Sequence, residues 1–231
     1  MAVDEAIFKA ITQNKVLPTL RLYTWNPPAV SIGYFQNADS PLVKEYLTRG
    51  YSLVRRPTGG LAVLHEDEMS YSMTGVMATG GFPSNVREAY RKAHESIRRA
   101  LLNLGLETML CQERKSATNS ALCSASWLPY DIILEHNGKI GGSAQRRSGN
   151  VLLQHGSISL PEELDRDCLR DRIAENFRKV LRIELEQQEL TEEECSVSEK
   201  LAENKYGQWK WNYRGRFLFL NRDQQVAEVL L

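Results

Sequence analysis

Three strand-like segments joined by two tight turns constrain the fold of this chain most. Residues 130–135, 139–147 and 151–160 each have the composition of a strand, and Asn137-Gly138 and Ser148-Gly149-Asn150 separate them. Asn-Gly is the strongest short hairpin signal, because a type I′ turn needs positive φ at both central residues. The sequence therefore predicts a three-strand antiparallel meander over this region.

Helical periodicity is clear elsewhere. Residues 3–11 and 84–105 each place apolar side chains on one stripe, and residues 161–181 are also predicted to be helical. A further helix is predicted from Thr191, because Thr-Glu-Glu-Glu has the pattern of a capping box. Strand-like runs occur at 19–25, 29–35, 51–56, 61–65 and 68–73. Because the sequence contains no internal repeat and no low-complexity linker, we expect one α+β domain over residues 1–231.

The charge balance excludes several classes of function. The chain has 29 Lys and Arg against 29 Asp and Glu, so it lacks the cationic excess typical of nucleic-acid or membrane-surface proteins. No segment approaches the roughly 18 apolar residues of a membrane span. The first residues do not have the pattern of a secretory signal, and the four cysteines form no C-x-x-C pair. These features predict a cytoplasmic protein with reduced thiols.

Cofactor motifs are missing from the sequence. The four histidines form no H-x-x-x-H pair, so we expect no metal site. Neither a Walker loop nor a G-x-G-x-x-G motif is present. We therefore expect no cofactor.

Two glycine-bearing segments have the residue types of a binding site. The first runs from Arg55 through Arg56, Pro57 and Thr58 to Gly59-Gly60. A glycine pair between strands permits positive φ and close approach of a ligand, and the arginines could bind a carboxylate, a phosphate or an acidic partner. The alternative is a hairpin turn with solvated arginines.

The second segment begins at Lys139 and continues through Gly141-Gly142, Ser143 and Ala144. Paired glycines weaken a strand, so they usually mark a bulge or a ligand against the backbone. The alternative role for Lys139 is a charge that protects an edge strand.

Residues 111–129 show no periodicity, and an irregular stretch of this length suggests function. Within it, Cys123 is flanked by small residues that leave a thiol approachable. A nearby ammonium group such as that of Lys139 would raise its thiolate fraction. Cys123 is therefore a candidate nucleophile.

These segments together resemble the lipoate–protein ligase A and octanoyltransferase family, which is related in fold to biotin–protein ligase. The resemblance runs from Met1-Ala2-Val3-Asp4-Glu5-Ala6 through residues 19–37, 55–65, 139–147 and 152–158 to residues 205–212. It implies a mixed, largely antiparallel sheet flanked by helices, without a C-terminal accessory domain. The acyl chain would lie between the two glycine-bearing strands.

The loop around Cys123 is similar to that of the LipM-type octanoyltransferases, whose nucleophilic cysteine lies seven residues before a Tyr-acidic pair. Cys123 keeps this spacing to Tyr130-Asp131, although Ser124 stands where those enzymes often have an aromatic residue. The resemblance implies an octanoyl-[acyl carrier protein]:protein N-octanoyltransferase of lipoate biosynthesis. Cys123 would take the acyl group as a thioester and pass it to a lysine of a lipoyl domain of a 2-oxoacid dehydrogenase or of the glycine cleavage H protein.

The same resemblance assigns roles to the remaining candidates. Lys139 would polarise the acyl carbonyl or act as acid and base, and burial would lower its pKa towards neutrality for the latter role. Backbone amides near Ser143 would be oxyanion donors. Room for the eight-carbon chain would come from Gly59, Gly60, Gly142 and Ala144.

The polar candidates would surround that chain. Arg55 and Arg56 would meet the acidic carrier proteins or the pantetheine phosphate, and Thr58 belongs to the same binding segment. His65 and His155 would border the pocket, with a core histidine as the equal alternative.

Two other functions stay open. One is an ATP-dependent lipoate–protein ligase, in which Lys139 binds an acyl-adenylate and ATP with Mg²⁺ is required. The other is a non-catalytic homologue that binds lipoyl domains.

Overall fold

The structure, a computed structural model, describes residues 1–115, 123–135, 138–161 and 164–213. Two sheets form its framework, a six-stranded sheet of order β1-β5-β9-β8-β7-β6 and a three-stranded sheet of order β3-β2-β4. The larger sheet contains β1 (Thr19–Tyr23), β5 (Met69–Val76), β6 (Thr108–Leu110), β7 (Ile132–Leu134), β8 (Gly138–Ser148) and β9 (Val151–Ile158). The smaller sheet contains β2 (Ala29–Ile32), β3 (Ser52–Arg55) and β4 (Val63–His65).

The larger sheet is antiparallel throughout, and β7, β8 and β9 form its meander. The predicted meander is therefore confirmed. Gly138 has φ +80°, which fits a tight turn, whereas Asn137 lies outside the described residues. A register shift between Ile132 and Ile133 makes a bulge opposite the start of β8.

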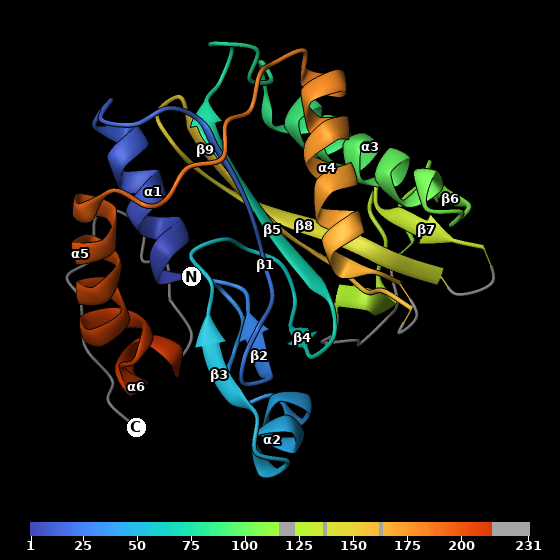
Figure 1. The fold of residues 1–231 in the computed structure, drawn as a ribbon. Coiled ribbons are helices and arrows are strands. Elements are labelled where there is room, and N and C mark those ends of the chain that lie inside the picture. Colours follow the sequence, from blue (N-terminus) through green and yellow to red (C-terminus); the bar gives the residue numbers. More distant parts are fainter. Residues whose placement is uncertain (116–122, 136–137, 162–163, 214–231) are drawn as a thin grey trace, which may run out of the picture.

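Helices cover the two faces of the larger sheet (Figure 1). On one face lie α3 (Val86–Asn103) and α4 (Arg166–Leu181), which share a core with Leu152 of β9. The neighbouring Val151 and Leu153 point the other way and pack against α1 (Ala2–Thr12). This alternation along one strand is what a sheet with two covered faces requires. The single α+β architecture with flanking helices agrees with the prediction.

The C-terminal helices extend the layer formed by α1. The first, α5 (Glu192–Leu201), packs against α1, and a π-helical turn η2 (Ala202–Tyr206) and the short α6 (Trp209–Asn212) follow it. The predicted capping box is present, because Thr191 and Glu194 exchange side-chain to backbone hydrogen bonds.

The smaller sheet determines the course of the first glycine segment. Strand β2 pairs in parallel with β3 and antiparallel with β4, and α2 (Pro41–Thr48) connects β2 to β3. Since β3 and β4 flank β2 on opposite sides, residues 56–62 cross the end of β2 and do not form a hairpin turn. They pass so close to Gly33 that a Cβ there would lie 1.9 Å from the carbonyl oxygen of Gly60.

Three details differ from the sequence-based expectations. Strand β6 has only three residues, too few for a periodic signal, and it was not predicted. Helix α4 begins at Arg166, well after residue 161. Val86, an apolar residue of the stripe predicted over residues 84–105, is 38% exposed and lies outside the buried face of α3. No helix in the described part of the chain is long and apolar enough to cross a membrane.

Candidate active site

A pocket lies where the two sheets meet, and most of the predicted site residues line it. Its lining comes from β2, β4 and the first glycine segment on one side, and from β1, β5, β8, β9 and the Cys123 loop on the other. The candidates that it brings together are Arg56, Gly60, His65, Cys123, Gly142, Ser143, Ala144 and His155. Arg55, Thr58, Gly59 and Lys139 do not line it.

Cys123 and Lys139 are in direct contact. The Nζ of Lys139, at the start of β8, lies 3.3 Å from the Sγ of Cys123. Cys123 begins a short 3₁₀ turn, η1 (Cys123–Ala125), and its backbone N–H donates to the carbonyl of Ala62 at 3.0 Å. The loop is thereby attached to the segment that follows the glycine pair, and Cys123 lines the pocket. The geometry is that of a thiol paired with an ammonium group.

The surroundings of Lys139 decide its charge state. Its Nζ donates to Oδ2 of Asp131 at 2.8 Å and to the carbonyl oxygens of Ser126 and Cys123 at 3.2 and 3.3 Å. Burial by itself lowers the pKa of Lys139, but the negative charges of Cys123 and Asp131 outweigh it and raise that pKa above its ordinary value. The predicted fall towards neutrality is therefore wrong. Lys139 is an ammonium ion at neutral pH and is not poised to accept a proton.

Gly142 makes room for Lys139. A Cβ at Gly142 would lie 2.5 Å from Cε and 2.7 Å from Nζ of Lys139, so the lysine side chain passes directly over this glycine. Gly142 also lines the pocket. A side chain at Gly142 would nevertheless meet Lys139 first. The absence of a side chain here therefore makes room for the lysine before it makes room for an acyl chain.

Arg56 holds the first glycine segment in place. Its guanidinium donates to both oxygens of Ser31, to the carbonyl of Gly59 at 3.0 Å and to that of Leu61 at 2.8 Å. Burial lowers its pKa to about 10. At 5% exposure Arg56 can reach a ligand inside the pocket, but it cannot meet the surface of a carrier protein as predicted.

His65 continues this network at the wall of the pocket. The Oγ of Ser31 lies 2.6 Å from Nε2 of His65, and Nδ1–H of His65 donates to the carboxylate of Glu68. Burial lowers the pKa of His65, so the ring is neutral and accepts from the Ser31 hydroxyl. The ring of Trp25 stacks on it at 4.1 Å. His65 therefore borders the pocket and also fixes the orientation of Arg56 through Ser31.

His155 occupies a similar place on β9. Its Nδ1 lies 3.3 Å from Oγ1 of Thr58, and its Nε2 lies 3.2 Å from Oδ2 of Asp4. Asp4 is fully buried and also accepts from Ser72 at 2.7 Å. Sequence reasoning did not select Asp4 as a site residue. The available signal was a carboxylate within the otherwise apolar stripe of the first helix.

Arg55 has a structural role. It is 1% exposed, and its guanidinium donates to five backbone carbonyls, those of Gly33, Tyr34, Gln36, Trp211 and Asn212. Three of these follow β2, and two belong to α6. The predicted contact of Arg55 with an acidic carrier protein or the pantetheine phosphate is therefore wrong, because the buried side chain joins the C-terminal helix to the smaller sheet.

We expect Arg55→Met to lower the free energy of unfolding by about 3 kcal/mol or more, because several hydrogen bonds from a charged group are lost and buried carbonyls are left unpaired. Urea denaturation measures the loss. The exposed Arg170, whose side chain is 53% accessible, gives the control Arg170→Met, which should change stability by less than about 0.5 kcal/mol. Equal stability of the two variants would contradict this role for Arg55.

The backbone N–H of Ser143 already has a partner. It donates to Oη of Tyr90 at 3.3 Å, so it is not a free oxyanion donor in this structure. The Tyr90 hydroxyl in turn donates to Oδ1 of Asp131. Tyr90 and Asp131 are two polar residues at the site that the sequence did not single out for a role, although Asp131 was noted for its spacing from Cys123.

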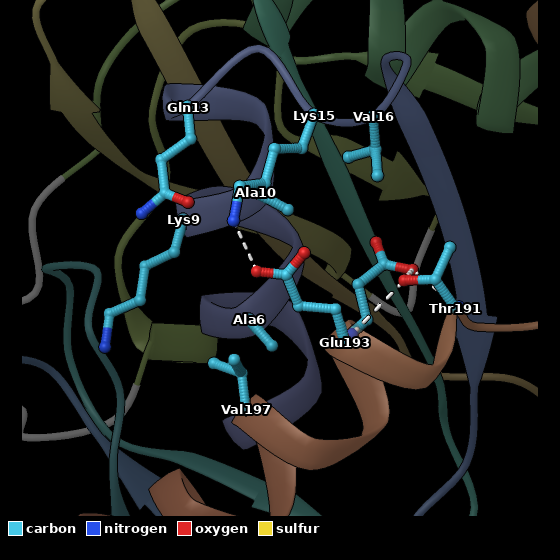
Figure 2. A pocket seen from close by; sticks show the side chains of 10 residues that line it. Ala6, Lys9, Ala10, Gln13, Lys15, Val16, Thr191, Glu193 and Val197 are labelled. Carbon is cyan, nitrogen blue, oxygen red and sulfur yellow. Dashed lines mark hydrogen bonds and ion pairs between the residues drawn. The ribbon is translucent and has the colours of Figure 1, made fainter.

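A second cavity, of about 200 Å³, lies between α1 and α5 (Figure 2). It is lined by small, apolar and charged side chains, with an ion pair between Lys15 and Glu193 at its rim. It shares no lining residue with the Cys123 pocket, and neither cysteine nor histidine lines it.

Within the described residues there is no group of three or more potential metal ligands.

Comparison with known proteins identifies the family to which the chain belongs. The model of the lipoyl protein ligase A/B catalytic domain matches residues 1–204, and the chain belongs to this family. Among curated relatives, the octanoyltransferase LipM of Kyrpidia tusciae is 40% identical, and that of Bacillus subtilis is 35% identical. Each alignment covers 93% of this chain and 93% of the relative.

Solved structures agree with this assignment. A lipoate-protein ligase A bound with ATP is 25% identical, with a TM-score of 0.72 and coverage of 92% of each chain. Protein Ta0514 of T. acidophilum, a putative lipoate protein ligase with bound lipoic acid, has a TM-score of 0.74 at 23% identity, over 92% of this chain and 91% of that one. The latter similarity supports the fold alone. The family resemblance and the fold class read from the sequence are thus confirmed.

Proposed function

We propose that this protein is an octanoyltransferase of lipoate biosynthesis. It takes octanoyl from the thioester of acyl carrier protein onto Cys123 and passes it to a lysine of a lipoyl domain or of the glycine cleavage H protein. The observation that carries the proposal is the 3.3 Å contact between Sγ of Cys123 and Nζ of Lys139 at the edge of the pocket. The names of the LipM relatives support the acyl group and the reaction type.

The chemistry needs no external energy source. The Cys123 thiolate attacks the carbonyl of octanoyl-acyl carrier protein, a new C–S bond forms, and the pantetheine thiolate leaves. One thioester replaces another of similar energy, so neither nucleotide nor metal is required. The amine of the acceptor lysine then attacks, the amide bond forms, Cys123 leaves as a thiolate, and the proton lost by the amine passes to solvent.

Lys139 acts in both half-reactions as a fixed positive charge. Its ammonium group stabilises the attacking thiolate in the first step and the departing thiolate in the second. The remaining pocket residues bind and orient the acyl donor, with Gly60 and Ala144 beside the chain and Arg56 as the buried cation. The balanced charge and the cysteine pattern support a cytoplasmic location, as do the expected protein substrates.

The experiment that tests this function compares two acyl donors. Octanoyl-acyl carrier protein without nucleotide should support octanoylation of a lipoyl domain, and octanoate with ATP and Mg²⁺ should not. Activity only with octanoate and ATP would assign the ATP-dependent ligase, which the similarity to an ATP-bound lipoate-protein ligase A makes the specific alternative. Activity with neither donor would leave a non-catalytic homologue.

A further inference from the structure

We propose that Asp131 is a positioning residue for acyl transfer, which keeps Lys139 as an ammonium ion directed at Cys123 while the sulfur carries the acyl group. The inference rests on the proposed function, because it concerns the acyl-enzyme of that reaction. It assigns a role to a buried carboxylate that touches neither the pocket nor the acyl group.

The carboxylate of Asp131 is held on both of its oxygens. Oδ2 accepts from Nζ of Lys139 at 2.8 Å and from the backbone N–H of Leu128 at 2.7 Å. Oδ1 accepts from the hydroxyl of Tyr90. The backbone N–H of Asp131 donates back to the carbonyl of Leu128 at 3.0 Å, and the side chain has no solvent exposure. The carboxylate is therefore fixed in one orientation, and it fixes the lysine in turn.

The backbone before Asp131 is strained, which supports a specific role. Tyr130 has φ +73°, a left-handed conformation that costs a residue with a side chain about 1 kcal/mol or more. It is kept there by two hydrogen bonds, from its N–H to the carbonyl of Cys111 at 2.8 Å and from Nδ1–H of His94 to its carbonyl at 2.7 Å. This turn directs Asp131 inwards, towards Lys139.

The charges around Lys139 change during the reaction. In the free enzyme it faces the sulfur of Cys123, which attacks as a thiolate, and the carboxylate of Asp131. Acylation converts the thiolate into a neutral thioester, whereas the burial that lowers the pKa of Lys139 persists. Nearby, His94 is neutral, because burial lowers its pKa to about 4, and Tyr90 keeps its proton because burial raises its pKa. Asp131 is then the one anionic partner of Lys139 among the described residues.

This arrangement matters most for the second half-reaction. The ammonium loses its bond to the thiolate on acylation, so one N–H is released towards the acyl group and the departing sulfur. Without Asp131, a buried lysine beside a neutral thioester would lose its proton at a lower pH. The leaving thiolate would then form next to a neutral amine, and transfer would slow.

The direct test is a heteronuclear NMR titration of the Lys139 Nζ, assigned by its absence in Lys139→Met. Iodoacetamide first converts Cys123 into a neutral thioether, which imitates the acyl-enzyme without any octanoyl donor. We expect wild-type Lys139 to remain protonated at pH 8, and Lys139 of the isosteric Asp131→Asn to lose its proton about 2 pH units lower than in the wild type. The wild-type titration does not depend on Asp131→Asn, so a wild-type Lys139 that is already neutral at pH 8 overturns the proposal even if Asp131→Asn fails to fold.

A kinetic measurement gives the second readout. Preformed octanoyl-Cys123 enzyme is mixed with a lipoyl domain, and single-turnover transfer is followed against pH. Asp131→Asn should transfer about 50-fold more slowly than the wild type at pH 8, and the deficit should widen as pH rises, since the lowered pKa of Lys139 removes the ammonium first in the variant. Transfer within about 3-fold of the wild type at every pH would overturn the proposal.

Two control variants separate charge from packing. Tyr90→Phe removes a hydrogen bond from Asp131 but keeps its charge, so Lys139 should titrate as in the wild type. Glu194→Gln changes a carboxylate that is 6% exposed in the capping box of α5, and it should alter neither readout. If the wild type forms no octanoyl-Cys123, the proposed function fails, whereas the NMR titration still reports on Asp131 and Lys139.

Discussion

Replacing Lys139 by alanine is expected to slow octanoyl transfer to a lipoyl domain by about 10³-fold, the effect of losing an electrostatic group at the reacting atoms. The ammonium group lies 3.3 Å from the sulfur of Cys123 and stabilises its thiolate in both half-reactions. Single-turnover kinetics of each half-reaction measure the loss. Lys115→Ala, which removes an exposed lysine from the irregular stretch that also carries Cys123, should stay within about 3-fold of the wild type. Transfer by Lys139→Ala within a few-fold would show that the lysine is only a structural charge.

The same substitution should also destabilise the fold. Lys139 and Asp131 form a buried ion pair, and removal of one partner from such a pair costs about 3–5 kcal/mol. The double variant Asp131→Asn/Lys139→Ala should recover part of this stability in urea denaturation without recovering activity. A folded but inactive double variant separates the chemical role of the lysine from its structural role.

The second large effect is expected at Gly142. A methyl group there would lie 2.5 Å from Cε of Lys139, so Gly142→Ala must displace the ammonium group from Cys123. A displacement of about 1 Å at reacting groups can cost 10²-fold in rate, and we expect at least that loss with hexanoyl, octanoyl and decanoyl donors alike. Kinetics with the three donors check this uniformity.

Gly59→Ala is the matched control for this experiment. Nothing lies within 4 Å of a Cβ at Gly59, and its φ is not positive, so its transfer rates should resemble those of the wild type. If Gly142→Ala lost octanoyl and decanoyl transfer but kept hexanoyl transfer, the glycine would make room for the acyl chain and not for Lys139.

The elements with strong local signals could be predicted from the sequence. Helix α3 has a long apolar stripe, and the meander has glycines at both turns. Strand β6 and the turn η1 have three residues each, too few for any period. The division into two sheets depends on β3 and β4 both pairing with β2, which is a tertiary choice that alternating residues in each strand do not encode.

The candidate site divides in the same way. Cys123 and Lys139 could be selected because their neighbours are small residues and glycines, and the structure does bring the two together. The partnership of Lys139 with Asp131 could not be predicted from the sequence. A bulge between Ile132 and Ile133 sets which residues of β7 and β8 face each other, and the sequence does not show this bulge. The negative charge of Cys123, together with that partnership, reverses the predicted direction of the lysine pKa.

The arginines show how distant contacts decide a role. Arg55 and Arg56 are adjacent in the sequence, but Arg55 is bound by carbonyls of α6, 156 and 157 residues away, and Arg56 by the segment 59–61. Both side chains are buried by these partners. Their local sequence is equally compatible with solvent exposure, so only the fold distinguishes a structural cation from a docking one.

Intact-mass analysis of the wild type after mixing with octanoyl-acyl carrier protein, without nucleotide, tests the covalent role of Cys123 most directly. We predict the gain of one octanoyl group, which hydroxylamine removes, which peptide mapping places on Cys123, and which a lipoyl domain discharges. An adduct that requires ATP, that maps to Cys111, or that a lipoyl domain does not discharge would contradict transfer through Cys123.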